Sequence, residues 1–109
     1  MKAAIKLSAL LALGLCGMNA AAGDVAAGEE KAVTCAACHG AGGAAPISPQ
    51  YPILAGQHAD YLVQSLLQYK NGERKNMIMA GLAAGLSEQD IEDLAAYFSA
   101  QSSPLRTVD

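Results

Sequence analysis

Apolar positions recur with a helical period in three parts of the chain and predict three main helices. The last predicted helix has the clearest pattern, because four apolar residues follow the i, i+3, i+4, i+7 spacing of one helical face: Ile91, Leu94, Ala95 and Phe98. Ser87 precedes them as an N-cap residue, and Asp90 follows three positions later as the partner of a capping box. Pro104 lies beyond the expected end of this helix.

The first predicted helix runs from about Asp24 to Cys38, with Asp24 as a plausible N-cap. Its small residues recur every four positions and would let another helix approach closely: Gly28, Ala32 and Ala36. The second predicted helix starts near His58 and ends at Gly72, a residue type that favours the left-handed conformation after a helix. One side of it carries Tyr61, Leu62, Ser65, Leu66 and Tyr69.

Irregular chain is expected between these helices. Residues 40–57 are rich in glycine, alanine and proline, a composition typical of a loop. A loop of that length in a small domain is usually functional. Met77 and Met79 lie two residues apart, so on an extended segment both would face the same side. No β-strand or repeat is apparent, and the pattern predicts an all-α fold.

The beginning of the chain is expected to be a cleaved signal peptide covering residues 1–21. Lys2 and Lys6 are followed by a short apolar run and then by small residues. The run is shorter than the roughly 18–20 residues that span a bilayer, so no stable membrane insertion is expected. Two alternatives are a buried N-terminal helix and a lipid anchor on Cys16, and Leu15 before that cysteine argues against the second. One domain, residues 22–109, would remain.

Loss of the leader changes the charge balance of the chain. Five basic residues would remain against ten acidic ones, which gives a net charge of about −5. A domain this acidic, with scattered Lys and Arg, lacks the basic surface that nucleic acids require. Its long-range field would favour a partner with a basic docking surface.

The motif Cys35-Ala36-Ala37-Cys38-His39 carries the chemistry. Two thiols one helical turn apart face the same way, so both can add to the two vinyl groups along one haem edge. The histidine that follows directly can then offer an imidazole nitrogen to the iron. The motif therefore predicts covalent haem c, attached at Cys35 and Cys38, with His39 as an axial ligand.

Two other readings of the motif are weaker. A thioredoxin-like redox pair would lie in a βαβ unit, and no β-branched alternation surrounds these cysteines. A structural zinc site would need two further ligands, and His58 is the only other histidine. Haem also fits the composition, because a small domain with one Phe and four Tyr is poorly equipped to build a core without it. The apoprotein is accordingly expected to be largely unfolded.

The second axial position has three candidates in the mature chain: Met77, Met79 and His58. Methionine raises the reduction potential relative to a second histidine, because its neutral thioether favours ferrous iron. His58 lies at the start of a predicted helix, where an exposed side chain is expected. Spacing alone does not choose between the two methionines.

Several further segments together resemble class I cytochromes c, and most closely one domain of the bacterial dihaem cytochrome c-four group and its single-haem relatives. The similarity spans about residues 23–101. Beyond the haem motif it is carried by Tyr51-Pro-Ile-Leu-Ala-Gly-Gln57, Lys70-Asn-Gly-Glu-Arg74, Met79-Ala-Gly-Leu-Ala-Ala-Gly-Leu86-Ser87 and Asp93-Leu-Ala-Ala-Tyr97-Phe98.

This resemblance implies a small class I cytochrome c fold, in which three main helices and their loops surround one haem. The first and last helices would cross where Gly28 meets the Leu94 and Tyr97 region. The resemblance favours Met79 over Met77 as the axial ligand. It also implies that Arg74 neutralises a haem propionate and that Tyr51 donates a hydrogen bond to one.

The expected function is that of a periplasmic electron carrier and not of an enzyme. Iron held by histidine and methionine has no open position, which suits one-electron transfer between Fe(II) and Fe(III) better than catalysis. The donor and the acceptor would be redox proteins. The alternative is a cytochrome subunit of a periplasmic dehydrogenase or of a sulfur-oxidising complex, because this chain has one haem motif where the dihaem proteins have two.

Overall fold

Helices account for all regular structure in the computed structural model, which describes residues 23–105. In chain order they are α1 (Val25–Lys31), α2 (Val33–His39), the short 3₁₀ helix η1 (Ala41–Gly43), α3 (Ala59–Asn71), α4 (Met77–Ala84) and α5 (Glu88–Ser99). The predicted all-α class is confirmed. The expected signal peptide, residues 1–21, lies outside the described residues. Within them, no helix is long and apolar enough to cross a membrane.

The first predicted helix is divided at Ala32 into α1 and α2, so the prediction of one continuous helix was wrong. Ala32 has φ −73° and ψ −9°, and its side chain is buried at 4% exposure. It joins a core formed with Leu62, Leu94, Ala95 and Phe98. Because α1 packs along α5 while Ala32 enters this core, the chain changes direction at that residue.

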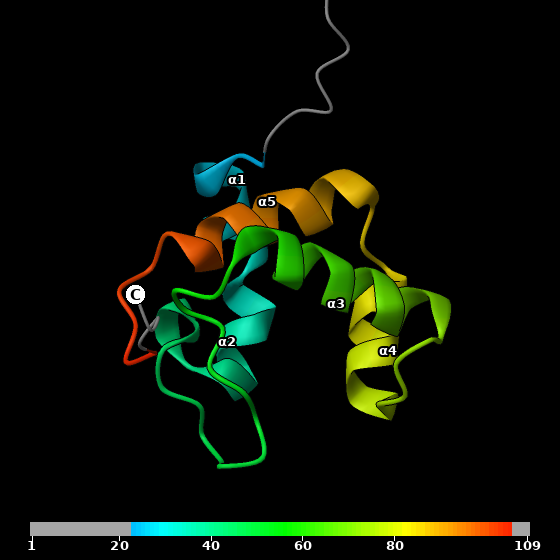
Figure 1. The fold of residues 1–109 in the computed structure, drawn as a ribbon, viewed down its shortest axis with the longest axis horizontal. Coiled ribbons are helices and arrows are strands. Elements are labelled where there is room, and N and C mark those ends of the chain that lie inside the picture. The colour runs from blue at the N-terminus through cyan, green and yellow to red at the C-terminus, as the bar shows by residue number, and fades with distance from the viewer. Residues whose placement is uncertain (1–22, 106–109) are drawn as a thin grey trace, which may run out of the picture.

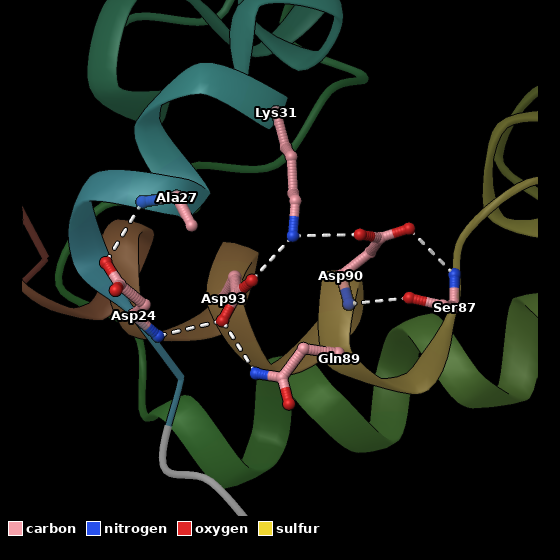
Figure 2. A network of polar contacts seen from close by, with 7 residues as sticks. All are labelled: Asp24, Ala27, Lys31, Ser87, Gln89, Asp90 and Asp93. Atoms are coloured by element: carbon pink, nitrogen blue, oxygen red, sulfur yellow. Dashed lines mark hydrogen bonds and ion pairs between the residues drawn. The ribbon is translucent and has the colours of Figure 1, made fainter.

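The crossing of α1 and α5 is the most extensive contact between helices in the described chain (Figure 1). Figure 2 shows the polar network beside it, in which the Lys31 ammonium lies 2.8 Å from Asp90 and 2.5 Å from Asp93. Asp93 also accepts hydrogen bonds from the backbone N–H of Asp24 and the side chain of Gln89. Lys31, as the main cause, holds the pKa of both carboxyl groups at about 2.

The two remaining predicted helices begin and end where the sequence indicates. α3 follows His58 and ends at Gly72, whose φ of +84° is left-handed. α5 has the expected capping box, since the Ser87 hydroxyl accepts from the Asp90 N–H and the Asp90 carboxylate accepts from the Ser87 N–H. The apolar face predicted for α5 is buried: Ile91, Leu94, Ala95 and Phe98.

The segment that begins at Met77 is helical, so the prediction of irregular chain between the second and the last predicted helix was wrong there. Asn76 caps α4, and its side-chain oxygen accepts from the N–H groups of Ile78 and Met79. The helix was missed because MIMAGLAA has no polar residue, and a segment without polar positions shows no amphipathic period.

Residues 44–58, between η1 and α3, are irregular, as the composition predicts. Backbone hydrogen bonds anchor this loop: Leu54 and Ala55 donate to the Gly43 carbonyl, and Gly56 donates to the Phe98 carbonyl at the end of α5. These contacts bring the Tyr51-Pro52 segment against the end of α2, where His39 lies.

Candidate functional site

Both thiols of the haem motif lie on α2. Cys35 and Cys38 are three residues apart on this helix, are half-buried, and are free cysteines. Burial raises the pKa of the Cys35 thiol. Three residues are close to one helical turn, so the two sulfur atoms come from the same side of the helix. The pair therefore has the spacing that two thioether bonds to one ring edge require.

His39, the last residue of α2, is buried at 5% exposure. Its Nδ1 lies 2.8 Å from the carbonyl oxygen of Pro52. A carbonyl only accepts, so Nδ1 carries the proton and donates, and the lone pair of the neutral ring lies on Nε2. The Tyr51 ring meets the imidazole edge-on with centroids 6.1 Å apart. The loop thus fixes the orientation of the ring and leaves Nε2 as the nitrogen that could bind a metal.

At the end of α2, the backbone of Gly40 lies very close to the backbone of Ala45. Gly40 follows His39 with φ +82°, and a Cβ at this position would lie 2.1 Å from the Ala45 carbonyl oxygen. The Cys38 carbonyl accepts a hydrogen bond from the Ile47 N–H. A side chain at Gly40 would therefore displace the turn that holds His39 beneath the loop.

The donor set fits haem c and does not support the two alternative readings. A pair of thiols with an oriented imidazole can supply two thioether bonds and one axial nitrogen. Within residues 23–105, no group of three or more His, Cys, Asp or Glu side chains could hold a metal ion, which argues against a zinc site. The same range contains no β-strand, so the βαβ setting of a thioredoxin-like pair is not present there.

Met77 and Met79 differ clearly in their surroundings. Met77 is 87% exposed, whereas Met79 is half-buried in the first turn of α4. Residues two apart on a helix point about 200° apart, so these side chains leave opposite sides of α4. Met79 shares its side with Ala83, which is fully buried. The helix therefore separates two positions that an extended chain would have placed on one side.

Arg74 lies in the connection between α3 and α4 and contacts two tyrosines of α3. Its guanidinium donates to the Tyr61 hydroxyl at 3.3 Å and lies 5.3 Å from the centre of the Tyr69 ring. This hydrogen bond is the main reason that the pKa of Tyr61 is lowered. Arg74 and Tyr51, both named for the propionates, lie on separate segments, and no hydrogen bond joins them within the described chain.

His58 is exposed directly before α3, as expected, and lines an open depression with Gln57, Asp60 and Tyr61. Sequence reasoning missed two residues that position the site. The acceptor for His39 is the backbone carbonyl of Pro52, which no side-chain pattern reveals. The second is Tyr61, whose contact with Arg74 depends on the fold of α3 and the connection that follows it. A separate signal was present in the sequence for α4, because Asn76 before an apolar run is typical of a helix N-cap.

The fold and this donor set together define an all-helical haem c protein. Residues 25–102 match the family model for cytochrome c. The chain is 48% identical to cytochrome c4 of Pseudomonas aeruginosa over 103 residues, covering 94% of this chain and 51% of that protein. It is 51% identical to cytochrome c-554(548) of Halomonas halodenitrificans over 83 residues, covering 73% of this chain and 99% of that one.

Among solved structures, the crystal structure of reduced recombinant cytochrome c4 from Pseudomonas stutzeri superposes with a TM-score of 0.72 at 41% identity, covering 81% of this chain and 50% of that chain. This chain belongs to the cytochrome c family and is related to the cytochrome c4 group. Its cofactor is covalently attached haem c, with which the Cys35 and Cys38 pair is consistent. The chain spans about half the length of its cytochrome c4 relatives.

Proposed function

We propose that this chain is a periplasmic one-electron carrier, in which haem c is attached through Cys35 and Cys38 and the iron is held by His39 and Met79. When bound, the haem supplies the reversible Fe(II)/Fe(III) couple. The observation that carries the proposal is the buried imidazole of His39, oriented by Pro52 on the same helix as two free thiols.

The residues of the chain have distinct tasks in this proposal. Cys35 and Cys38 would hold the haem through two thioether bonds. The Pro52 carbonyl keeps the His39 proton on Nδ1, so Nε2 would be the nitrogen that binds the iron. Met79 would supply the second ligand to the iron, which would leave no site for a substrate. Its half-buried place on α4 supports this assignment, and the 87% exposure of Met77 argues against that residue.

Arg74 and Tyr51 are proposed to contact the haem propionates. The hydrogen bond to Tyr61 and the contact with Tyr69 hold the guanidinium in one orientation, which supports a fixed role for its charge. Tyr51 lies beside His39, which supports a place near the ring. Both propionate contacts are roles that the resemblance to class I cytochromes c implies for these two residues.

A single preparation tests the ligation. The full chain, produced in a host that matures c-type cytochromes, should retain its haem in acidified acetone and show a sulfur-to-iron charge-transfer band in the ferric state. A potentiometric titration should give one wave for one electron. An extractable haem, or a spectrum with an open sixth position, would contradict the proposal.

The periplasmic location is supported by the leader pattern of residues 1–21. Donor and acceptor are proposed to be redox proteins, and the net negative charge of the chain favours a basic docking surface on one of them. Cell fractionation tests the location, and recovery of the haem protein in the cytoplasm would contradict it.

A second candidate function is supported by one relative. The chain is 41% identical to the thiosulfate dehydrogenase electron acceptor of Thiomonas intermedia, covering 73% of this chain and 37% of that protein. This chain would then serve as the electron-transfer subunit of a periplasmic enzyme. Size-exclusion chromatography of a native extract distinguishes the two, since a subunit elutes with a larger polypeptide and a free carrier elutes alone.

A further inference from the structure

Arg74 is held against the side of α3 by three contacts. Its backbone N–H donates to the Gln68 carbonyl at 3.1 Å. Its guanidinium donates to the Tyr61 hydroxyl at 3.3 Å and lies 5.3 Å from the centre of the Tyr69 ring. The two tyrosines are a little over two helical turns apart, so their rings leave α3 on the same side. The guanidinium is therefore fixed both in position and in orientation.

These contacts leave the positive charge of Arg74 available to an anion. A guanidinium carries five N–H donors, and the hydrogen bond to the Tyr61 hydroxyl uses one of its nitrogen atoms. Within residues 23–105, no ion pair joins Arg74 to a carboxylate, whereas Lys31 forms ion pairs with two aspartates of α5. The chain has ten acidic residues against seven basic ones, so a basic residue without a carboxylate partner is notable. Arg74 thus keeps both charge and donors for another group.

Tyr61 holds this guanidinium and contributes little to the core. Its side chain is 46% exposed, whereas the neighbouring Leu62 is buried at 6% exposure. The hydrogen bond from Arg74, as the main cause, lowers the pKa of the Tyr61 hydroxyl, because the guanidinium favours the charged form of the phenol. The contact with Arg74 therefore gives Tyr61 a role that packing does not explain.

We propose that Tyr61 is a positioning residue, whose hydroxyl holds the Arg74 guanidinium at a haem propionate and thereby raises the reduction potential. This inference rests on the proposed function, in which Arg74 contacts a propionate. A fixed positive charge beside the haem favours Fe(II), since the oxidised centre carries one more positive charge. A guanidinium released from Tyr61 would spend more time in solvent, where water and salt screen its charge. The oxidised state would then be favoured more than in the wild type.

Potentiometric titration of the haem-loaded full chain measures this effect. Arg74→Gln removes the charge, and we expect its Fe(III)/Fe(II) ratio at a fixed potential to rise about threefold to tenfold, which is a fall of about 30–60 mV in the midpoint. Tyr61→Phe keeps the ring and removes only the hydroxyl, so a smaller rise of about twofold to threefold is expected. Lys75→Gln is the matched control, because it removes the same charge from the next position, which is exposed. It should shift the ratio less than either variant.

The double variant Tyr61→Phe/Arg74→Gln distinguishes a positioning role from a direct one. If Tyr61 acts through Arg74, its replacement should change nothing further once the guanidinium is gone. A further fall in the midpoint, as large as in Tyr61→Phe alone, would mean that Tyr61 acts on the haem itself and would overturn the inference. Equal shifts in Lys75→Gln and Arg74→Gln would also overturn it, because net charge would then account for the change.

The sulfur-to-iron charge-transfer band separates this role from support of α4. Arg74 lies in the connection that leads to Met79, so loss of the Tyr61 hydroxyl could instead loosen the helix that carries this methionine. The band would then weaken in Tyr61→Phe, and the inference would be overturned. We expect the band to keep its wild-type intensity in Tyr61→Phe and in Arg74→Gln while the midpoint falls.

The same titrations distinguish failure of the inference from failure of the proposed function. A wild type without covalent haem or without methionine ligation contradicts the proposed function, and the inference falls with it. If both are in place and Arg74→Gln keeps the wild-type midpoint, the propionate contact of Arg74 is refuted together with the inference. If Arg74→Gln lowers the midpoint and Tyr61→Phe does not, only the inference fails.

Discussion

Gly28 of α1 lies directly against the backbone of Asp93 in α5. A Cβ at Gly28 would come within 2.1 Å of the Asp93 carbonyl oxygen and 2.7 Å of the Tyr97 Cβ. The same residue, Asp93, binds Lys31 and Asp24 through its side chain, so one position of α5 meets α1 through both its backbone and its carboxylate (Figure 2). The expected crossing of the first and last helices at Gly28 is thereby confirmed.

Gly28→Ala should destabilise the protein, because the added methyl group meets backbone that cannot move away. We expect a loss of about 1–3 kcal/mol or more in the free energy of unfolding, as for other overpacked contacts. Gly81→Ala is the control, since its Cβ meets open space and alanine favours a helix by about 0.5–1 kcal/mol over glycine. Denaturant unfolding followed by far-UV circular dichroism measures both. Equal stability of Gly28→Ala and the wild type would contradict the packing described.

Met79→Ala should abolish the sulfur-to-iron charge-transfer band and lower the reduction potential, because the neutral thioether that favours ferrous iron is lost. Axial ligands set haem potentials over about 0.8 V, and the change should be a sizeable part of that range. Met77→Ala, which removes a side chain that is 87% exposed, should leave both properties unchanged. The reverse result would transfer the axial role to Met77.

Replacing both thiols, in the double variant Cys35→Ala/Cys38→Ala, should leave any haem extractable by acidified acetone, because no thioether bond can form. Each single variant should retain one bond and resist extraction. Thr34→Ala, an exposed change on the same helix, serves as the control. Haem that stays with the double variant after extraction would show that attachment occurs elsewhere.

Removal of haem should cost the domain much of its structure. Half of the eight buried apolar residues in the described chain are alanines, and only Leu62, Ile91, Leu94 and Phe98 are large. A core this small needs the additional apolar mass of a porphyrin. Far-UV circular dichroism of the double cysteine variant without haem should therefore show a large loss of helix. A helical apoprotein with cooperative unfolding would refute this.

Acidification should weaken the fold through Asp90 and Asp93. Lys31, as the main cause, lowers the pKa of both from 3.8 to about 2, so the unfolded state binds more protons than the folded state between these values. The stabilisation is complete above pH 3.8 and is lost as the pH falls towards 2. Unfolding in denaturant at a series of pH values measures this slope.

In the variant Asp93→Asn, the slope of stability against pH should be shallower than in the wild type, because one of the two depressed carboxyl groups is gone. Glu29→Gln makes the same change in net charge at an exposed position of α1 and is the control. If Asp93→Asn and the wild type show the same slope below pH 4, the network does not control acid stability.

Most of the fold was predictable because its signals are local. The Ser87 and Asp90 capping box, the face Ile91 to Phe98 and the glycine after α3 each involve residues within a turn or two of one another. α4 was not predictable in this way, since an apolar segment without polar positions leaves only its Asn76 cap as a signal. The break at Ala32 was also hidden, because it follows from the contacts of Ala32 with α3 and α5.

The sequence by itself determined the chemistry that the protein can perform. Cys35, Cys38 and His39 are adjacent in the chain, and their spacing on one helical turn predicts covalent haem before any contact is known. Only the tertiary structure decided how the His39 ring is oriented and which methionine is exposed. The Pro52 carbonyl orients His39 from a loop 13 residues away, and the helical turn at Met77 sends the two methionines to opposite sides of α4. These relationships depend on backbone direction and on contacts between distant segments, and residue identity encodes neither on its own.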